Sequence, residues 1–126
     1  MGKKKIVFIA VPDEGKDDAL VSRARNVTAK AYLQFSNLTI TDVAFVLAFN
    51  NKLNHVQVPE GTNEEIVELS EAVKKLSMAD EAIFGKHWQN SNKCRILHNI
   101  CETYGIEHVT IDNIEELKGE NKNGKQ

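Results

Sequence analysis

The order of apolar and polar positions predicts a parallel β-sheet whose strands alternate with helices. Residues 5–11 (KIVFIAV) form an unbroken, β-branched-rich run, which is typical of a strand covered on both faces. Residues 19–35 carry apolar side chains at helical spacing and predict a helix that Asp17 or Asp18 would cap. Residues 38–41 (LTIT) then predict the second strand.

The second half of the chain continues this alternation. Thr62 and Glu65 have the spacing of a capping box and predict the start of a helix that runs to about Ala79. The remaining elements are predicted as a strand over 82–84, a helix over 93–104 that Gly105 ends, a strand over 108–111 and a helical turn over 114–117. This pattern predicts an α/β fold, a three-layer sandwich with a mostly parallel, Rossmann-like (flavodoxin-like) sheet.

The segment over residues 42–59 fits this pattern least well. Its apolar part, residues 43–49 (VAFVLAF), is compatible with a strand or with a short helix. Residues 50–54 would then turn into a further short strand over 55–58. If the sheet is complete without this segment, an apolar face is left for a second subunit to cover. On that ground we expect a homo-oligomer.

Length and composition limit the number of domains, the kinds of partner and the cellular compartment that we expect. The chain has 126 residues, a length that suits one domain, and we expect that domain over 1–118 with a disordered polar tail over 119–126. The net charge of −2 offers no basis for binding nucleic acid. The first apolar run is too short for a signal sequence or a bilayer span, so no membrane partner is expected. Two cysteines without a secretory signal indicate reduced thiols and a cytoplasmic protein.

One stretch concentrates the candidate chemistry. The polar loop over 85–93 follows a predicted strand and leads into a helix, so it lies at the carboxyl edge of the sheet, where α/β proteins bind small ligands. Helix amides favour anions there, and an aromatic ring can stack on a base. The loop after the first strand opens at the same edge and offers groups for ribose hydroxyls. The predicted ligand-binding residues are Pro12, Asp13, Gly15, Lys86, Trp88, Asn90, Ser91, Asn92 and Arg95.

Several short blocks of the sequence carry a resemblance to a known family. They are residues 6–12 (IVFIAVP), 76–84 (LSMADEAIF), Trp88, 94–98 (CRILH) and 104–106 (YGI). With these blocks the chain resembles the nucleoside 2-deoxyribosyltransferase superfamily, in its small branch that is common in bacteriophage genomes. The resemblance covers the first twelve residues and about forty near the C-terminus. It implies a nucleoside-related ligand and, in a phage setting, the sequestration of a host nucleotide signal.

The resemblance also implies which chemistry is missing. In the family a glutamate attacks the anomeric carbon and expels the nucleobase. The matching position here is Leu97, and no acidic residue lies between Glu81 and Glu102. His98 is adjacent, but one helical step turns a side chain by about 100°. The family's glycine before the cysteine is Lys93 here. We therefore predict no catalytic residues and lean away from an enzyme.

Three functions remain open at this stage. The first is a catalytically degenerate relative that binds a nucleoside- or nucleotide-derived molecule, and so sequesters a host nucleotide signal used in antiviral defence. The second is an active deoxyribosyltransferase or N-glycosidase that uses another acid, with Asp13 or Glu14 as candidates. The third is a protein-binding inhibitor module that contacts its partner through residues 43–49.

Several single residues have competing interpretations. Cys94, His98 and Cys101 share a helical face, but three ligands from one helix are a weak zinc signal, so we predict no metal and no cofactor. Trp88 is either a stacking platform for a base or a packing residue of its loop. Arg95 either contacts a ligand or forms an internal ion pair. Tyr104 is predicted to lie in the core.

Overall fold

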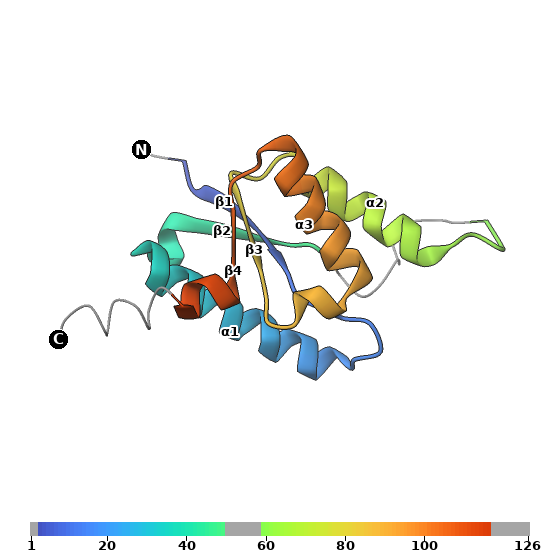
Figure 1. Ribbon diagram of the computed structural model, residues 1–126, viewed down its shortest axis with the longest axis horizontal. Helices are drawn as coiled ribbons and strands as arrows, with labels where there is room; N and C mark the ends of the chain where they lie inside the picture. The colour runs from blue at the N-terminus through green and yellow to red at the C-terminus, as the bar shows by residue number, and fades with distance from the viewer. Residues whose placement is uncertain (1–2, 50–58, 117–126) are drawn as a thin grey trace.

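A four-stranded parallel sheet organises the structure, a computed structural model that describes residues 3–49 and 59–116 (Figure 1). Its strands are β1 (Lys5–Ala10), β2 (Val43–Leu47), β3 (Glu81–Phe84) and β4 (His108–Thr110). They lie in the order β2-β1-β3-β4, and every neighbouring pair is parallel. Flavodoxin-like sheets have the same order in their first four strands, with a topological switch between β1 and β3.

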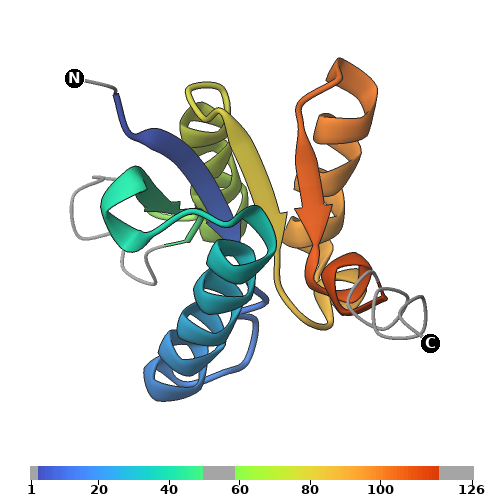
Figure 2. The ribbon, with the colours of Figure 1, turned by 90° about the vertical axis from the view of Figure 1, so that its left-hand side faces the viewer.

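Helices cover both faces of this sheet, as Figure 2 shows. Helices α2 (Glu64–Leu76) and α3 (Asn92–Tyr104) pack on one face. Helix α1 (Asp18–Ser36) and the helical segment over 111–116 pack on the other. The predicted three-layer α/β sandwich is therefore confirmed.

The alternation of side chains along β1 explains why both faces are covered. Val7 and Ile9 lie in the core cluster that includes Tyr32 of α1. Phe8 belongs to the opposite cluster, with residues of α2 and α3 that include Leu97. Because successive strand residues point to opposite faces, a strand apolar at every position requires a helical layer on each side.

The predicted strand over 38–41 is wrong. The structure has a 3₁₀ helix, η1 (Ile40–Asp42), in this region, and the second strand begins at Val43. The backbone amide and the hydroxyl of Thr39 both donate to the Asp42 carboxylate, at 2.8 and 2.9 Å. Such local hydrogen bonds from threonine and aspartate compete with strand pairing. The β-branched pattern of this segment therefore gives way to a turn.

Residues 43–47 of the apolar middle segment form a strand rather than a helix. This strand, β2, pairs in parallel with β1, with Lys5 opposite Val43 and Ile9 opposite Leu47. The premise of a sheet that is complete without this segment is therefore wrong, and the argument for a homo-oligomer that rested on it no longer applies. The oligomer itself stays a prediction. The strand predicted over 55–58 and the tail predicted over 119–126 lie outside the described residues.

The predicted ends at Asp17 and Gly105 are confirmed, whereas α2 differs from the prediction at both ends: it begins one residue later and ends at Leu76 rather than near Ala79. Asp17 caps α1 by accepting a hydrogen bond from the amide of Leu20 at 2.9 Å. Gly105 ends α3 in the left-handed conformation, with φ of 68°. At α2, however, Asn63 is the capping residue and accepts from Ile66, so the cap predicted at Thr62 is wrong. The Thr62 amide instead donates to the Pro59 carbonyl in a preceding turn.

Two polar residues have structural roles at the amino edge of the sheet. Asp80 accepts a hydrogen bond from the amide of Ile6 at 2.8 Å and aligns the entrances of β1 and β3. Buried Glu81 accepts from the Tyr32 hydroxyl at 2.6 Å and pairs with Lys5 at 2.7 Å. Burial raises the pKa of Tyr32 to about 12, so this hydroxyl stays a donor.

Tyr104 is 77% exposed, so the prediction that it is a core residue is wrong; it is the last residue of α3.

Gly85, directly after β3, lies where two elements approach closely. A Cβ atom at this position would lie 2.7 Å from Val11 Cγ1 and 3.0 Å from Thr28 Oγ1 of α1. We expect Gly85→Ala to lower the free energy of unfolding by about 1–3 kcal/mol, because the methyl group overpacks this contact. Urea unfolding measures the loss. Combining Gly85→Ala with Val11→Ala should cost less than the sum of the two single substitutions. Additive losses, or a change below about 0.5 kcal/mol for Gly85→Ala, would contradict the close approach.

Candidate functional site

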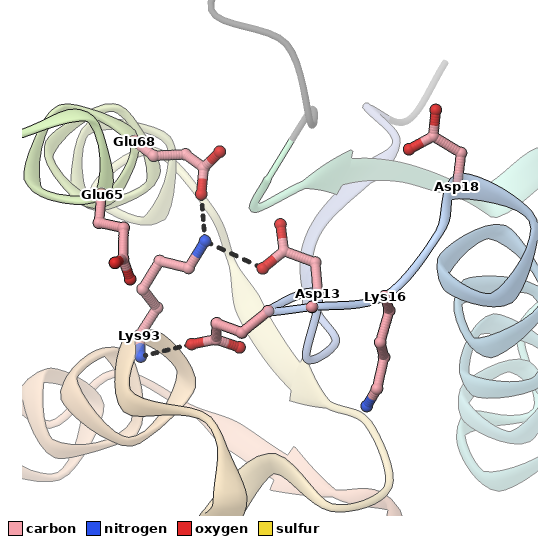
Figure 3. A pocket seen from close by; sticks show the side chains of 8 residues that line it. Asp13, Lys16, Asp18, Glu65, Glu68 and Lys93 are labelled. Atoms are coloured by element: carbon pink, nitrogen blue, oxygen red, sulfur yellow. Dashed lines mark hydrogen bonds and ion pairs between the residues drawn. The ribbon is translucent and has the colours of Figure 1, made fainter.

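A pocket of about 380 Å³ lies beyond the carboxyl end of β1 and reaches the start of α3, which follows β3. Open parallel sheets bind ligands at such a switch point, where neighbouring strands lead to helices on opposite faces. The pocket is lined by the loop after β1, the start of α1 and the first turns of α2 and α3 (Figure 3). Its lining residues are Asp13, Glu14, Gly15, Lys16, Asp18, Glu65, Glu68 and Lys93.

The loop after β1 forms one wall of this pocket. Pro12 is buried beneath it, and the Lys16 amide donates to the Asp13 carbonyl at 3.2 Å to close a turn. Gly15 adopts φ of 70°, a left-handed conformation that glycine accepts without strain. Of the nine predicted ligand-binding residues, Asp13 and Gly15 line this pocket.

Lys93 of α3 links the walls of the pocket through ion pairs with Asp13 and Glu68. Only 5% of this residue is exposed, and its amino group lies between the carboxylates of Asp13 and Glu68 (Figure 3). The Nζ–Oδ1 distance to Asp13 is 2.9 Å, and Nζ also lies 4.4 Å from the centroid of the Phe49 ring. Burial acts to lower the pKa of Lys93, but the two carboxylates outweigh it and raise the pKa above its ordinary value. Lys93 is therefore a charged cross-link between the loop after β1, α2 and α3.

Glu14 occupies the amino end of α3. Its carboxylate accepts hydrogen bonds from the Ser91 hydroxyl at 2.9 Å and from the Lys93 amide at 3.4 Å. Ser91 caps the helix by accepting from the amide of Cys94. Burial acts to raise the pKa of Glu14, but these hydrogen bonds outweigh it and hold the pKa below its ordinary value. The protein's own carboxylate thus takes the place that a bound phosphate would occupy at this helix end.

The charges of the lining favour hydroxyl and amino groups over anions. Five of the lining residues carry carboxylates and two carry amino groups. Lys93 is already paired with two of the carboxylates. Carboxylates accept hydrogen bonds from ribose hydroxyls, as the acidic residue of dinucleotide-binding folds does. A phosphate group would meet net negative charge here, which raises the free energy of its binding.

The other predicted ligand-binding residues lie outside this pocket, apart from the supporting positions of Pro12 and Ser91. Lys86 and Asn90 are exposed on the loop after β3. Asn92 and Arg95 line a second pocket of about 360 Å³ on the outer side of α3, together with Ile96 and Asn99. Arg95 donates to the Asn92 side chain. The structure therefore divides the predicted set among the acidic pocket, the loop after β3 and the second pocket on α3.

Trp88 packs within the protein and not on the pocket. Its ring stacks on His98 at a centroid distance of 4.1 Å and an interplanar angle of 22°. Phe84 lies beside it at 5.9 Å. Since the imidazole already stacks on the indole, the geometry supports the packing interpretation of Trp88 over the base-stacking one.

Leu97 does not line the pocket either. It is fully buried in the core cluster with Phe8 and Phe84, on the face of α3 that packs against the sheet. Cys94 and Cys101 lie in the same cluster as free thiols. Burial raises the pKa of Cys94 to about 12 and that of Cys101 to about 11. Both thiols are therefore neutral groups of the core, and the metal-ligating atoms that converge around His98 among the described residues do not include them.

Sequence reasoning missed most of the charged lining. It omitted Lys16, Asp18, Glu65, Glu68 and Lys93 from the predicted ligand-binding set, and treated Glu14 only as an alternative acid. One signal was present for the residues of α2. Helices that follow parallel strands begin at the carboxyl edge, so acidic side chains in the first turns of such a helix lie at the ligand-binding edge. No comparable signal indicated that the Lys93 side chain turns inward.

The fold and the pocket together define the class: an α/β protein with a flavodoxin-like strand order and an acidic pocket at its switch point. No protein-family model, curated protein or solved structure matches the chain. Within residues 3–49 and 59–116, no helix has the length and apolar character that a bilayer crossing requires.

Proposed function

We propose that this protein binds a nucleoside-derived small molecule in the pocket at the β1/β3 switch point and does not transform it. The observation that carries the proposal is the acidic pocket itself. It lies where open α/β sheets bind ligands, and its volume falls in the range of small-molecule sites. Its carboxylates are acceptors for the hydroxyl groups of a sugar.

The charge of the pocket narrows the ligand class. The end of α3 is capped by Glu14, and the lining carries more carboxylates than amino groups. An unphosphorylated nucleoside, or the nucleoside moiety of a larger ligand, therefore suits the pocket better than a nucleotide phosphate does. Binding without turnover is the property that sequestration of a nucleotide signal in the cytoplasm would need. That role follows from the family resemblance alone.

Two structural facts support binding over catalysis. The position that matches the family's nucleophile is Leu97, in the core rather than in the pocket. Asp13, one of the two alternative acids, is paired with Lys93 and has a side chain only 8% exposed. A carboxylate held in that way is poorly placed to attack a sugar, because it would have to leave its ion pair first.

A thermal-shift screen against nucleosides, nucleoside monophosphates and ADP-ribose tests the proposal. We expect a nucleoside at 100 times its dissociation constant to stabilise the protein by about 2.7 kcal/mol, and its 5′-monophosphate to bind more weakly. Glu65→Gln should reduce the nucleoside shift, because it removes a lining carboxylate while it keeps the size of the side chain. Glu64→Gln, one residue earlier on α2 and outside the lining, is the matched control and should leave the shift unchanged. No shift with any of these compounds would refute the proposal.

A second candidate is an N-glycosidase or deoxyribosyltransferase that uses Glu14. The observation that favours it is the state of this carboxylate, which lines the pocket and is held ionised by Ser91 and the Lys93 amide. An ionised carboxylate can attack the anomeric carbon and expel the base, and the glycosyl ester then passes to a second base or to water.

Chromatography of deoxynucleosides incubated with a free base separates the two candidates. Binding without catalysis predicts that base exchange stays at the rate of the protein-free mixture. Exchange that is lost in Glu14→Gln but retained in Glu64→Gln would establish the enzyme instead. Native mass spectrometry of the same preparation measures the oligomeric state, for which we propose a homo-oligomer.

A further inference from the structure

Two histidines and a glutamate meet on the flank of α3, away from the acidic pocket. His98 and Glu102 are one turn apart on this helix, and His108 is the first residue of β4. One ligand atom from each residue lies within 4.8 Å of the others. Glu102 Oε2 and His108 Nε2 are 3.3 Å apart. Lys93 is near the start of α3 and Glu102 near its end, about 13 Å along the axis, so this group is separate from the pocket.

The hydrogen bonds of His108 leave its other nitrogen available for a metal ion. Nδ1 lies 2.7 Å from the carbonyl oxygen of Ile106, which can only accept, so Nδ1 carries the proton. In the neutral ring Nε2 then has a free lone pair, and it faces Glu102. Metal-bound histidines commonly donate their second nitrogen to a backbone carbonyl in this way, which fixes the tautomer and the ring orientation.

Aromatic packing holds His98 in place beside this ring. Trp88 stacks on one face of His98, and Phe84 meets its edge at a centroid distance of 5.2 Å. The His98 and His108 rings are 4.9 Å apart and nearly perpendicular, at 88°. Both rings are partly buried, whereas the side chain of Glu102 is 62% exposed. Two packed imidazoles and one exposed carboxylate therefore lie together where solvent can reach them.

We propose that His98, Glu102 and His108 bind a zinc ion. Two imidazole nitrogens and one carboxylate oxygen are a recurrent zinc ligand set, which leaves the fourth tetrahedral position for water or another ligand. The nitrogen ligands disfavour magnesium and calcium, which prefer oxygen donors. A tetrahedral zinc with bonds of about 2.0–2.2 Å holds its ligand atoms roughly 3.4 Å apart. Glu102 Oε2 and His108 Nε2 are already 3.3 Å apart, so what remains is a small approach between His98 and this pair.

Isothermal titration of the tag-free full chain with zinc, after removal of metals with a chelator, tests the proposal. We expect saturable binding of one ion per chain and a rise in melting temperature, because the ion binds only the folded arrangement. Glu102→Gln and His108→Ala should each weaken zinc binding by more than about tenfold. Cobalt in place of zinc should give the visible absorption bands of a tetrahedral site, and these bands should be lost in both variants.

Other histidines provide the controls for this experiment. His87→Asn removes an exposed imidazole and keeps a residue that tolerates the left-handed backbone found there, with φ of 67°. His55→Ala removes the histidine that lies outside the described residues. Both controls should keep wild-type affinity. Absence of saturable zinc binding by the wild type would overturn the proposal, as would unchanged affinity in Glu102→Gln. Because the side chain of Glu102 is exposed, a weaker affinity in this variant is not explained by loss of folding.

Discussion

Replacing Lys93 with methionine is expected to lower the free energy of unfolding by about 3 kcal/mol. Methionine keeps the apolar stem of the side chain beside Phe49 but removes the charge. The carboxylates of Asp13 and Glu68 would then face each other without the cation that now pairs with both. Two partly buried negative charges without a partner destabilise the folded state, because they have lost water and gained nothing in its place. Urea unfolding followed by circular dichroism measures the loss.

The neighbouring charges allow the origin of this loss to be tested. Adding Asp13→Asn and Glu68→Gln to Lys93→Met removes the uncompensated charges, so the triple variant should recover most of the lost stability. Lys86→Met replaces an exposed lysine of the loop after β3 and should change stability by less than about 0.5 kcal/mol. A loss below about 1 kcal/mol for Lys93→Met would show that the ion pairs contribute little.

Introducing a carboxylate at position 97, by Leu97→Glu, is expected to unfold or strongly destabilise the protein rather than to create activity. Leu97 is fully buried between α3 and the sheet. A carboxyl group there loses its hydration without gaining a hydrogen-bond partner, which costs at least about 3 kcal/mol in addition to the apolar contacts that are lost. The expected loss follows from the burial of this position.

The pH dependence of the Leu97→Glu variant gives a second readout. Burial disfavours ionisation, so the folded state holds the proton of the introduced carboxyl more tightly than the unfolded state does. The variant should therefore lose stability relative to wild type as the pH rises above about 4.3, the ordinary pKa of glutamate. Ile96→Glu, one residue earlier and 46% exposed, is the matched control and should be nearly neutral. Base exchange by a folded Leu97→Glu variant would contradict this description of the site.

The elements that could be predicted from the sequence were those whose hydrophobic pattern is compatible with only one arrangement of the backbone. A run apolar at every position, as in β1, needs cover on both faces, and this requirement defines the sandwich. The segment over 38–41 was mistaken for a strand because Thr39 and Asp42 offer the backbone a local alternative. Competition of this kind depends on side-chain geometry, which a hydrophobic pattern does not contain.

The candidate site was only partly predictable for a related reason. The carboxyl edge of the sheet and the loop after β1 were identified from the order of the elements, which includes Asp13 and Gly15. The side-chain directions of the loop after β3 were not. Trp88 turns to His98, and Arg95 turns to the outer side of α3. Trp88 is oriented by its contact with His98 and Arg95 by its hydrogen bond to Asn92, and the residue pattern indicates neither contact.

The amino-acid sequence by itself determined the fold class, the sheet edge at which the candidate pocket lies and the lack of a carboxylate at position 97, because these follow from residue type and order. Only the tertiary structure decided which residues line the pocket and what net charge they carry. Lys93 turns inward between two carboxylates, and Glu14 takes the helix end at which the sequence predicted a bound anion. The convergence of His98, Glu102 and His108 also appears only when α3 packs beside β4. Chain order places the backbone, whereas electrostatic pairing depends on distances that exist only after folding.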